Sequence, residues 1–326
     1  MRIRTVAAVF LAFAAIANPG FVTRAMAAET VLRIGHFPNI THPQALVAHA
    51  MSRQGRGWFE QRLGPDVAIE WYVYNAGPSA MEAIFAGTAD LTYVGPGPAI
   101  NAYARARGED IRIVAGAVEG GAALVVQPDS TLRAPADFRG KTLATPQLGN
   151  TQDVAARSWL IQGGLRITLT GGDAQVVPTA NPDQIALFRT RRVDAVWTVE
   201  PWVSRLELEA DGRVLLEEKD AVTTVLASSR KFLEQRRDLV RRVVAAHAAL
   251  THWILANPAE ARDLIRQELE AETRAKVSAG LVAHAWPRII LTNRVSRDAL
   301  ETFVAKAKDA GFLRGTPDLA RLVETP

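Results

Sequence analysis

The sequence predicts an α/β fold of two lobes, each built on an open, mainly parallel sheet, with a C-terminal part that is mostly helical. Short apolar runs typical of strands alternate with segments of helical periodicity, which is the pattern of strands joined by crossover helices. The chain has 326 residues, of which 48% are hydrophobic. That is enough to bury a core in each of two lobes.

The expected strands are short apolar runs that end close to a turn or loop. They are residues 31–35, 67–73, 90–94, 111–115, 123–127, 142–145, 175–177, 195–198 and 223–228. The chain from Lys231 onward is expected to be almost entirely helical. Pro258 suits the first turn of one of these helices, with Asn257 as its cap.

The first 27 residues predict an export signal. Arg2 and Arg4 form a positively charged start, residues 6–17 form an apolar run, and residues 25–27 supply the small side chains of a cleavage site. An uncleaved membrane anchor is the alternative, but the apolar run falls short of the ~20 residues that span a bilayer. We expect cleavage before Ala28 and a soluble mature protein.

Charge and cysteine content exclude several function classes. Removal of Arg2, Arg4 and Arg24 with the signal leaves 35 Lys and Arg against 34 Asp and Glu. The remaining basic residues are dispersed, which excludes a nucleic-acid footprint. The chain has no cysteine, so disulfides, thiolate metal sites, cysteine nucleophiles and a lipid anchor at the export site are excluded. The simplest destination is the periplasm of a double-membraned bacterium.

Three loops place the start of a helix after an expected strand. They run from Thr41 to Pro43, from Gly95 to Pro98 and from Gly149 to Asp153. Thr41 is the expected cap of the first helix, and Asn150 or Thr151 that of the third. The first amides of a helix lack partners within it and the dipole is positive there, so these loops predict a site for a small polar ligand or anion. Gly149 allows the backbone to approach that ligand closely.

Two segments of the chain resemble each other. Residues 85–98 and 188–202 each contain a helix end, a turn, an Asp, an apolar strand and a Pro-containing loop before the next helix. The doubled unit indicates two similar lobes, each with a helix start at the carboxyl edge of its sheet, where ligands of open α/β sheets bind. The alternative is that this order of elements simply recurs in any α/β protein.

An enzyme is one alternative function. Asp90, Asp194 and Glu200 with His42 are candidate acid and base groups, but Asp90 and Asp194 stand where Asp commonly caps a turn. The sequence contains no G-x-S-x-G elbow, P-loop or G-x-G-x-x-G fingerprint. The prolines of residues 95–98 also remove amide donors that a pyrophosphate needs. We therefore expect no enzymatic activity.

A zinc site is a second alternative. His36, His42 and His49 lie close in sequence, and His42 and His49 can share a helix face at i, i+7. This spacing is about 10 Å along a helix axis, and no further ligand follows at helical spacing. The sequence therefore predicts neither a metal nor another cofactor. His42 is expected to donate a hydrogen bond to the ligand.

Six motifs in collinear order cover nearly the whole mature chain. They are Arg33-Ile34-Gly35-x-x-Pro38-Asn39-x-Thr41-His42, Gly95-Pro96-Gly97-Pro98-Ala99, Gly121-Ala122-Ala123-Leu124-Val125-Val126, Ala136-Asp137-Phe138-Arg139-Gly140-Lys141, Thr145-Pro146-Gln147-Leu148-Gly149-Asn150-Thr151-Gln152-Asp153 and Glu200-Pro201-Trp202. Together they resemble the periplasmic substrate-binding proteins of ABC importers for aliphatic sulfonates, taurine, nitrate and related compounds.

This resemblance implies a Venus-flytrap fold with the ligand between two lobes. Residues 1–27 are then the signal peptide, 28–117 the first part of lobe 1, 118–221 lobe 2, and 222–326 the mostly helical second part of lobe 1. The implied function is capture of a small anion, foremost an aliphatic sulfonate or taurine, by a monomer that delivers it to the membrane subunits of an ABC permease. A receptor for nitrate, bicarbonate or a neutral or amine-bearing heterocycle is the alternative.

The resemblance also assigns ligand-binding residues. They are Asn39, Thr41, His42, Gln44, Gly97 and Pro98 from the first lobe, Gly121 at the hinge, and Gln147, Gly149, Asn150, Thr151, Gln152, Glu200 and Trp202 from the second lobe. An oxyanion accepts bonds from helix-start amides and from Thr, Asn and Gln side chains, so no Arg is required. Trp202 and Phe37 are expected to cover an organic tail. Glu119 and Glu200 would favour an amine-bearing ligand if they face the cleft.

Overall fold

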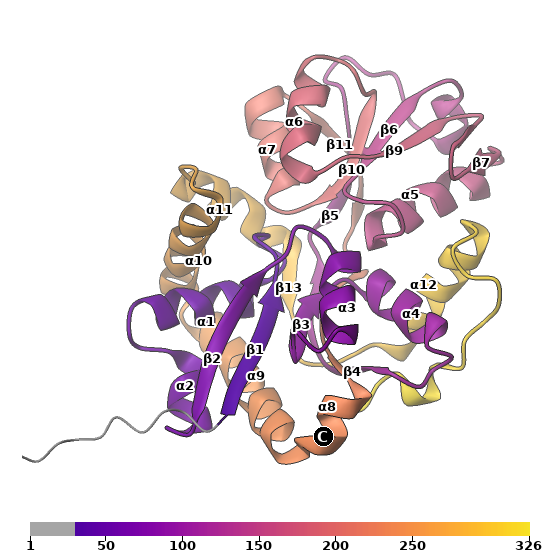
Figure 1. Ribbon diagram of the computed structural model, residues 1–326. Helices are drawn as coiled ribbons and strands as arrows, with labels where there is room; N and C mark the ends of the chain where they lie inside the picture. The colour runs from indigo at the N-terminus through magenta and orange to yellow at the C-terminus, as the bar shows by residue number, and fades with distance from the viewer. Residues whose placement is uncertain (1–29) are drawn as a thin grey trace, which may run out of the picture.

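Residues 30–326 are described by the computed structural model, and they form two lobes, each built around one sheet (Figure 1). The expected signal peptide, residues 1–27, lies outside the described residues. Within residues 30–326, no helix combines the length and the apolar character that crossing a membrane requires.

The first lobe contains a six-stranded sheet in the order β13-β4-β12-β3-β1-β2. Its strands are β1 (Thr30–His36), β2 (Val67–Val73), β3 (Leu91–Val94), β4 (Ile111–Gly120), β12 (Val222–Ser229) and β13 (Ile289–Leu291). One apolar cluster joins this sheet to α1 (Pro43–Arg53), α2 (Trp58–Leu63), α9 (Arg237–Ala256), α10 (Pro258–Thr273) and α11 (Ala279–Ala285). A second cluster joins it to α3 (Gly77–Phe85), α4 (Pro96–Arg105) and α12 (Arg297–Asp309). The short helix α8 (Arg230–Gln235) follows β12.

The second lobe contains a five-stranded sheet in the order β11-β5-β10-β6-β9. Its strands are β5 (Ala122–Val126), β6 (Thr142–Thr145), β9 (Gln175–Pro178), β10 (Ala195–Val199) and β11 (Arg213–Glu218). The apolar cluster on one side includes α5 (Thr151–Gln162), and the cluster on the other includes α6 (Asn181–Arg189) and α7 (Trp202–Ala210). The remaining short elements are β7 (Ile167–Thr168), β8 (Gly171–Gly172) and 3₁₀ turns at Pro135–Phe138, Trp286–Arg288 and Leu319–Arg321.

The nine expected strands are all present in two open sheets, and each sheet contains both parallel and antiparallel pairs. Strands β1, β2 and β3 run parallel, as do β10, β6 and β9. Strand β12 is antiparallel to β3 and β4, and β5 is antiparallel to β10 and β11. The chain passes from β4 into β5 and from β11 into β12 without a crossover helix. A strand that enters directly from the other sheet can run opposite to its neighbours, since only parallel pairs require a crossover.

The two similar segments of the sequence form equivalent structures in the two lobes. The Asp90 amide donates to Arg33 O at 2.9 Å, and Asp90 Oδ2 accepts from the Arg33 amide at 2.8 Å. Asp194 and Thr142 repeat this pair of bonds in the second lobe, both at 2.9 Å. Each Asp therefore joins its own strand to the neighbouring one through both backbone and side chain.

Both passages between the sheets are short. The first runs through Gly120 and Gly121, whose φ angles are +73° and +75°. This backbone conformation strains most other residues. Strand β4 still pairs with β13 at Gly120, so the chain leaves the first sheet slightly later than the expected boundary at residue 118. The second passage lies between β11 and β12, at residues 219–221.

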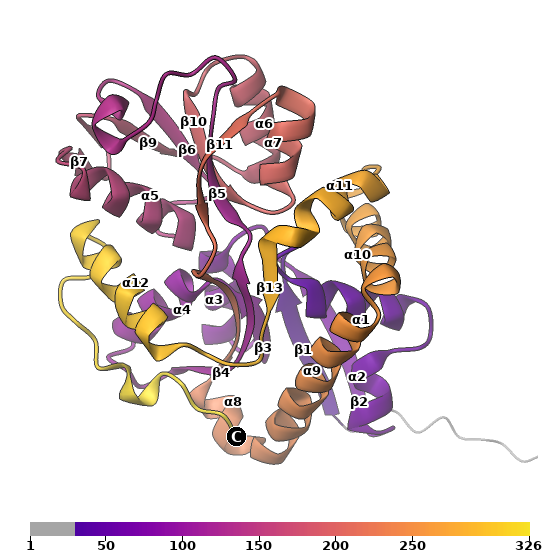
Figure 2. The ribbon, with the colours of Figure 1, turned by 180° about the vertical axis from the view of Figure 1, so that it is seen from behind.

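Two C-terminal helices of the first lobe also contact the second lobe (Figure 2). Helix α12 packs against α5, with Phe303 and Val154 in one apolar cluster. Helix α11 packs against α7, where His284 Nδ1 lies 2.9 Å from Ser204 Oγ. The C-terminal part therefore contributes to the contact between the lobes.

Two helix starts differ from the sequence prediction. The residue that precedes α1 is His42, not Thr41, and no side chain caps this helix. Thr41 instead uses its carbonyl oxygen to accept a bond from Thr224 Oγ1 at 2.7 Å. Asn257 precedes α10 as expected, but its side-chain amide donates back to Trp253 O at 2.9 Å. Its side chain therefore closes the end of α9 and does not cap α10.

Candidate ligand-binding cleft

A small cavity lies between the two lobes, beside the loops that leave the strands of both sheets. Its volume is about 40 Å³, which is room for about three water molecules. The lining residues are Phe37, Asn39, Thr41, His42, Asn75, Ala76, Gly77, Gly95, Pro98, Pro146, Asn150, Thr151, Gln152, Asn181, Val199 and Thr223. A compact group bound here would contact both lobes.

The loop between β1 and α1 forms much of the first-lobe wall. The Asn39 amide donates to Phe37 O at 2.8 Å, and the His42 amide donates to Asn39 O at 2.9 Å. The rings of Phe37 and His42 pack against each other with centroids 4.6 Å apart. Asn39, Thr41 and His42 are all buried. The internal hydrogen bonds and the packing therefore hold this wall in place.

His42 brings a neutral ring to the cavity. The Phe37 amide donates to His42 Nδ1 at 3.4 Å, which assigns the ring proton to Nε2. Burial lowers the pKa of His42 well below its ordinary value, and the nearby His36 acts in the same direction. The imidazole can therefore donate a hydrogen bond without adding a full positive charge.

The start of α5 forms the second-lobe wall. Asn150 is the N-cap, and its Oδ1 accepts from the Asp153 amide at 2.8 Å. The amides of Thr151 and Gln152 precede the first intrahelical hydrogen bond and point out of the helix end. The helix dipole adds a partial positive charge at the same place. This end of α5 therefore offers amide donors suited to an oxyanion.

A buried ion pair supports the loop before α5. Asp153 Oδ2 accepts from the Gly149 amide at 2.9 Å and from Arg157 Nε at 3.1 Å, and Asp153 Oδ1 accepts from Thr145 Oγ1 at 2.8 Å. Arg157 also donates to Thr168 O and Val176 O. The carboxylate is fully buried, and its neighbours fix the loop that leads to Asn150.

No Asp, Glu, Lys or Arg is among the residues that line the cavity. Glu119 belongs to β4, where it pairs with Val222 and Ile290. Glu200 lies behind the wall, where its carboxylate accepts from the Ser204 amide and from Arg288, each at 3.0 Å. Burial raises the pKa of Glu200, although Ser204 and Arg288 counteract this effect. The cavity is therefore polar and without fixed full charges.

Several hydrogen bonds join the lobes around the cavity. The Gly97 amide donates to Thr151 Oγ1 at 3.2 Å, and Trp202 Nε1 donates to Asn39 Oδ1 at 2.9 Å. Asn101 Nδ2 donates to Gly149 O at 3.3 Å. The Arg288 bond to Glu200 adds a partly buried ion pair on the side of α7. The lobes therefore stand in a closed arrangement.

The structure brings half of the expected binding residues together at the cavity. Those that line it are Asn39, Thr41, His42, Pro98, Asn150, Thr151 and Gln152. Gly97, Gly149 and Trp202 make the bonds between the lobes, and Gly121 lies in the first passage between the sheets. Gln44 points away and donates to Ala117 O and Thr251 Oγ1. Gln147 Oε1 is buried and has no hydrogen-bond partner within residues 30–326.

Sequence reasoning missed several lining residues. Asn75, Ala76 and Gly77 follow β2, Asn181 follows β9, and Thr223 belongs to β12. The first four share a signal with the loops that were expected, namely a strand followed by Asn, Gly or Pro at the start of a helix. Thr223 carries no such signal. It lies near the start of β12, and it reaches the cavity because the chain passes there from the second sheet back into the first.

Comparisons with known proteins agree with the resemblance seen in the sequence. Residues 25–267 match the model of the NMT1-like family. An Escherichia coli (strain K12) protein, named as an aliphatic sulfonates-binding protein, is 29% identical over 188 residues, or 56% of this chain and 56% of that protein. The matched stretch therefore spans little more than half of that relative.

Solved structures with the same fold include binding proteins for two kinds of anion. The alkanesulfonate-binding protein from Xanthomonas axonopodis pv. citri, bound to MOPS, aligns with a TM-score of 0.74 at 22% identity, over 92% of this chain and 100% of that chain. The periplasmic nitrate-binding protein from Synechocystis PCC 6803 gives a TM-score of 0.68 at 14% identity, over 88% and 83%. These likenesses confirm the expected two-lobed α/β fold.

Proposed function

The chain belongs to the NMT1-like family, and we propose that it is the substrate-binding component of an ABC importer. It captures a small anion in the cleft between its lobes and presents the closed form to the membrane permease. The related proteins named for aliphatic sulfonates, alkanesulfonates and nitrate support this role.

The lining of the cavity carries the proposal. It combines the start of α5 with the side chains of Asn39, Thr41, His42 and Gln152, and it contains no acidic or basic residue. An anion in such a site is held by several hydrogen bonds from neutral donors, each worth more than a neutral pair because the ligand is charged. A cation would find no carboxylate to neutralise it, and burial of an unpaired charge is costly.

A short alkanesulfonate is the ligand class that we favour. Phe37, Val199 and Pro98 give part of the wall an apolar surface that suits a short tail, beside the polar groups that suit an oxyanion. Taurine carries an ammonium group, for which the lining offers no carboxylate. Nitrate or bicarbonate is the second candidate, because the small cavity also suits a planar anion without a tail.

Ligand binding is coupled to closure through groups on both lobes. Donors of the β1–α1 loop and of the α5 start lie on opposite walls, so only the closed form allows all of them to reach one ligand. A ligand shifts the lobes toward closure by the difference in its affinity for the two forms. Gly120 and Gly121 supply a backbone able to absorb the rotation.

The remaining parts of the proposal concern the cell. We infer that residues 1–27 direct export, that the mature chain acts as a periplasmic monomer, and that the rims of both lobes contact the permease. The start of the chain has the charge, apolar run and small residues of a cleaved signal.

A thermal-melting screen of the purified protein tests this function. The panel contains ethanesulfonate, taurine, nitrate, bicarbonate, sulfate and, as a cationic control, ethylamine. A ligand at ~100 times its dissociation constant adds about 2.7 kcal/mol to the free energy of unfolding. We expect ethanesulfonate to raise the melting temperature most and ethylamine to leave it unchanged. Stabilisation by ethylamine alone would exclude an anion receptor.

A further inference from the structure

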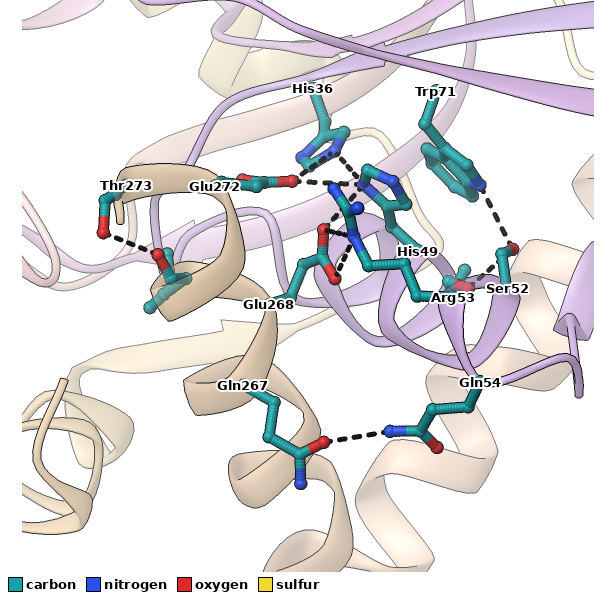
Figure 3. Close-up of polar contacts among 12 residues, drawn as sticks. His36, His49, Ser52, Arg53, Gln54, Trp71, Gln267, Glu268, Glu272 and Thr273 are labelled. Carbon is teal, nitrogen blue, oxygen red and sulfur yellow. Dashed lines mark hydrogen bonds and ion pairs between the residues drawn. The ribbon is translucent and has the colours of Figure 1, made fainter. Parts of the chain in front are cut away.

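A second group of ionisable side chains lies in the first lobe, where the end of β1 meets α1 and α10 (Figure 3). His36 comes from the end of β1, His49 from α1, and Glu268 and Glu272 from α10. His36 is fully buried, and both carboxylates are 1% exposed. None of these residues lines the cavity described above.

Three donor atoms in this group face one another at nearly equal distances. His36 Nε2 lies 3.2 Å from His49 Nδ1 and 3.0 Å from Glu272 Oε1, and His49 Nδ1 lies 3.1 Å from the same oxygen. Four ligands at about 2.0–2.1 Å from a zinc ion are about 3.3 Å apart at the corners of a tetrahedron. The three atoms therefore occupy positions close to one face of such a tetrahedron.

His49 Nδ1 has more polar neighbours than one ring nitrogen can hydrogen-bond well. A neutral imidazole nitrogen has either one proton or one lone pair, so it makes one good hydrogen bond. His49 Nδ1 has a third polar neighbour, Glu268 Oε1, at 2.8 Å. Glu272 Oε2 is buried and has no hydrogen-bond partner among the described residues. A cation at the centre would use these lone pairs together.

The surroundings resemble the outer shell of a metal site. His36 Nδ1 lies 3.4 Å from Phe37 O, which allows it to donate there and leaves the Nε2 lone pair for an ion. Arg53 Nε binds both oxygens of Glu268 at 2.9 and 3.0 Å. The Trp71 ring lies against both imidazoles. Arg53 therefore pairs with Glu268, whereas the ion-pair contacts of Glu272 among the described residues are to His36 and His49 alone.

We propose that His36 Nε2, His49 Nδ1 and the Glu272 carboxylate bind a divalent transition-metal ion of the zinc type. Glu268 Oε1 contacts His49 Nδ1 at 2.8 Å, and a water molecule fills the remaining coordination position. Two imidazoles and a carboxylate suit zinc, whereas Mg²⁺ and Ca²⁺ prefer oxygen ligands alone. The inference goes beyond the proposed anion receptor, because this site is separate from the cleft.

The ion joins three elements that are far apart in the sequence. It connects the end of β1 to α1 and α10, and the loop that forms the first-lobe wall begins at Phe37, directly after His36. Because the ion binds the folded lobe and not the unfolded chain, it stabilises the fold by mass action. Its expected role is to stabilise the packing of α10 against β1 and α1.

Zinc titration of the purified protein tests the site. The protein is first stripped with EDTA, then titrated with zinc chloride, with magnesium chloride as the control, and bound metal is counted by mass spectrometry. We expect one zinc ion per chain, a higher melting temperature with zinc and no effect of magnesium. Cobalt(II) in place of zinc should give the d–d absorption of a four-coordinate site. Failure of the wild-type protein to retain zinc would overturn the proposal.

Variants locate the ion. Glu272→Gln keeps the shape of the side chain but removes its charge, and His49→Ala removes a ligand. Each should lower zinc affinity by at least the ~10–100-fold typical of outer-shell changes. The matched control is His252→Ala, an exposed histidine on α9, which should bind zinc as the wild type does. Circular dichroism checks the fold of each variant. Unchanged zinc affinity in folded Glu272→Gln would show that zinc binds elsewhere.

Discussion

Trp202 Nε1 donates a hydrogen bond of 2.9 Å to Asn39 Oδ1 and so ties α7 of the second lobe to the cleft wall of the first. Both side chains are buried. The bond exists only when the lobes are closed, because its donor and acceptor belong to different lobes. Ligand affinity should therefore depend on Trp202 even though this residue does not line the cavity.

Trp202→Phe should weaken binding of the ligand. The change keeps an aromatic ring but removes the indole donor, so the closed form loses about 0.5–1.5 kcal/mol. The dissociation constant should rise by roughly two- to tenfold. Calorimetric titration measures this rise. Trp159→Phe is the control, because Trp159 packs on Phe138 and Trp197 within the second lobe. An equal loss of affinity in both variants would argue against a bond that acts through closure.

Asn150→Ala combined with Thr151→Ala should weaken anion binding by about 1–3 kcal/mol, since hydrogen bonds to a charged ligand are lost. The double variant also loses the cap of α5, which costs about 0.5–2 kcal/mol of stability. Ser229→Ala removes the cap of α8, where Ser229 Oγ accepts from the Phe232 amide at 3.1 Å. This control should lower stability without changing affinity. Unchanged affinity in the double variant would remove the α5 start from the site.

Arg157→Met should destabilise the second lobe strongly. It leaves the buried Asp153 carboxylate without its ion-pair partner, and breaking such a pair costs about 3–5 kcal/mol. Arg191→Met breaks an ion pair with Asp129 in which both partners are exposed, so it should change the free energy of unfolding far less than Arg157→Met does. Urea unfolding monitored by circular dichroism compares the two. Equal free energies of unfolding in the two variants would contradict a structural role for the buried pair.

His247 should make the stability depend on pH. Its Nε2 lies 2.8 Å from Gly116 O and its Nδ1 lies 2.9 Å from the Tyr93 hydroxyl, and burial lowers its pKa to about 4. In the unfolded chain the His247 imidazole binds a proton near pH 6.5, whereas in the folded protein it stays neutral down to about pH 4. Its contribution to the free energy of unfolding is therefore complete above pH 6.5 and is lost as the pH falls toward 4. The loss approaches about 3 kcal/mol.

Urea unfolding at pH 7.0 and 4.5 measures this dependence. The wild type should lose more stability than His247→Gln over this interval, because a glutamine side chain does not titrate. The raised pKa of Glu200 acts with the opposite sign, since protonation of that carboxyl is favoured in the folded state, but it is present in both proteins and cancels in the comparison. Equal losses would exclude His247 as a source of the pH dependence.

The elements with strong local signals were predictable. Strands such as β1 and β12 are apolar runs that end at turns, and Asn150 caps α5 as expected. Strand β13 has three residues and β11 is only partly buried along its length. Neither strand therefore shows a clear alternation of apolar and polar residues. Their pairing depends on how the chain returns between the lobes, which local sequence does not encode.

The cleft was more predictable from local sequence than the group of His36, His49 and Glu272. Residues of the cleft wall lie in loops after strands, which local sequence reveals. The second group was not predictable, because His49 and Glu272 meet only through packing of α10 on α1. Sequence spacing instead favoured His42 as a partner of His49, whereas His42 lines the cavity. The tertiary contact between distant helices decides which histidines come together.

A crystal structure of the protein grown with saturating ethanesulfonate tests the anion site directly. We expect the sulfonate oxygens to accept hydrogen bonds from the Thr151 or Gln152 amides while the first-lobe wall near Thr41 and His42 closes on the same molecule. A ligand bound to one lobe alone, or an empty cleft at saturating concentration, would contradict this expectation.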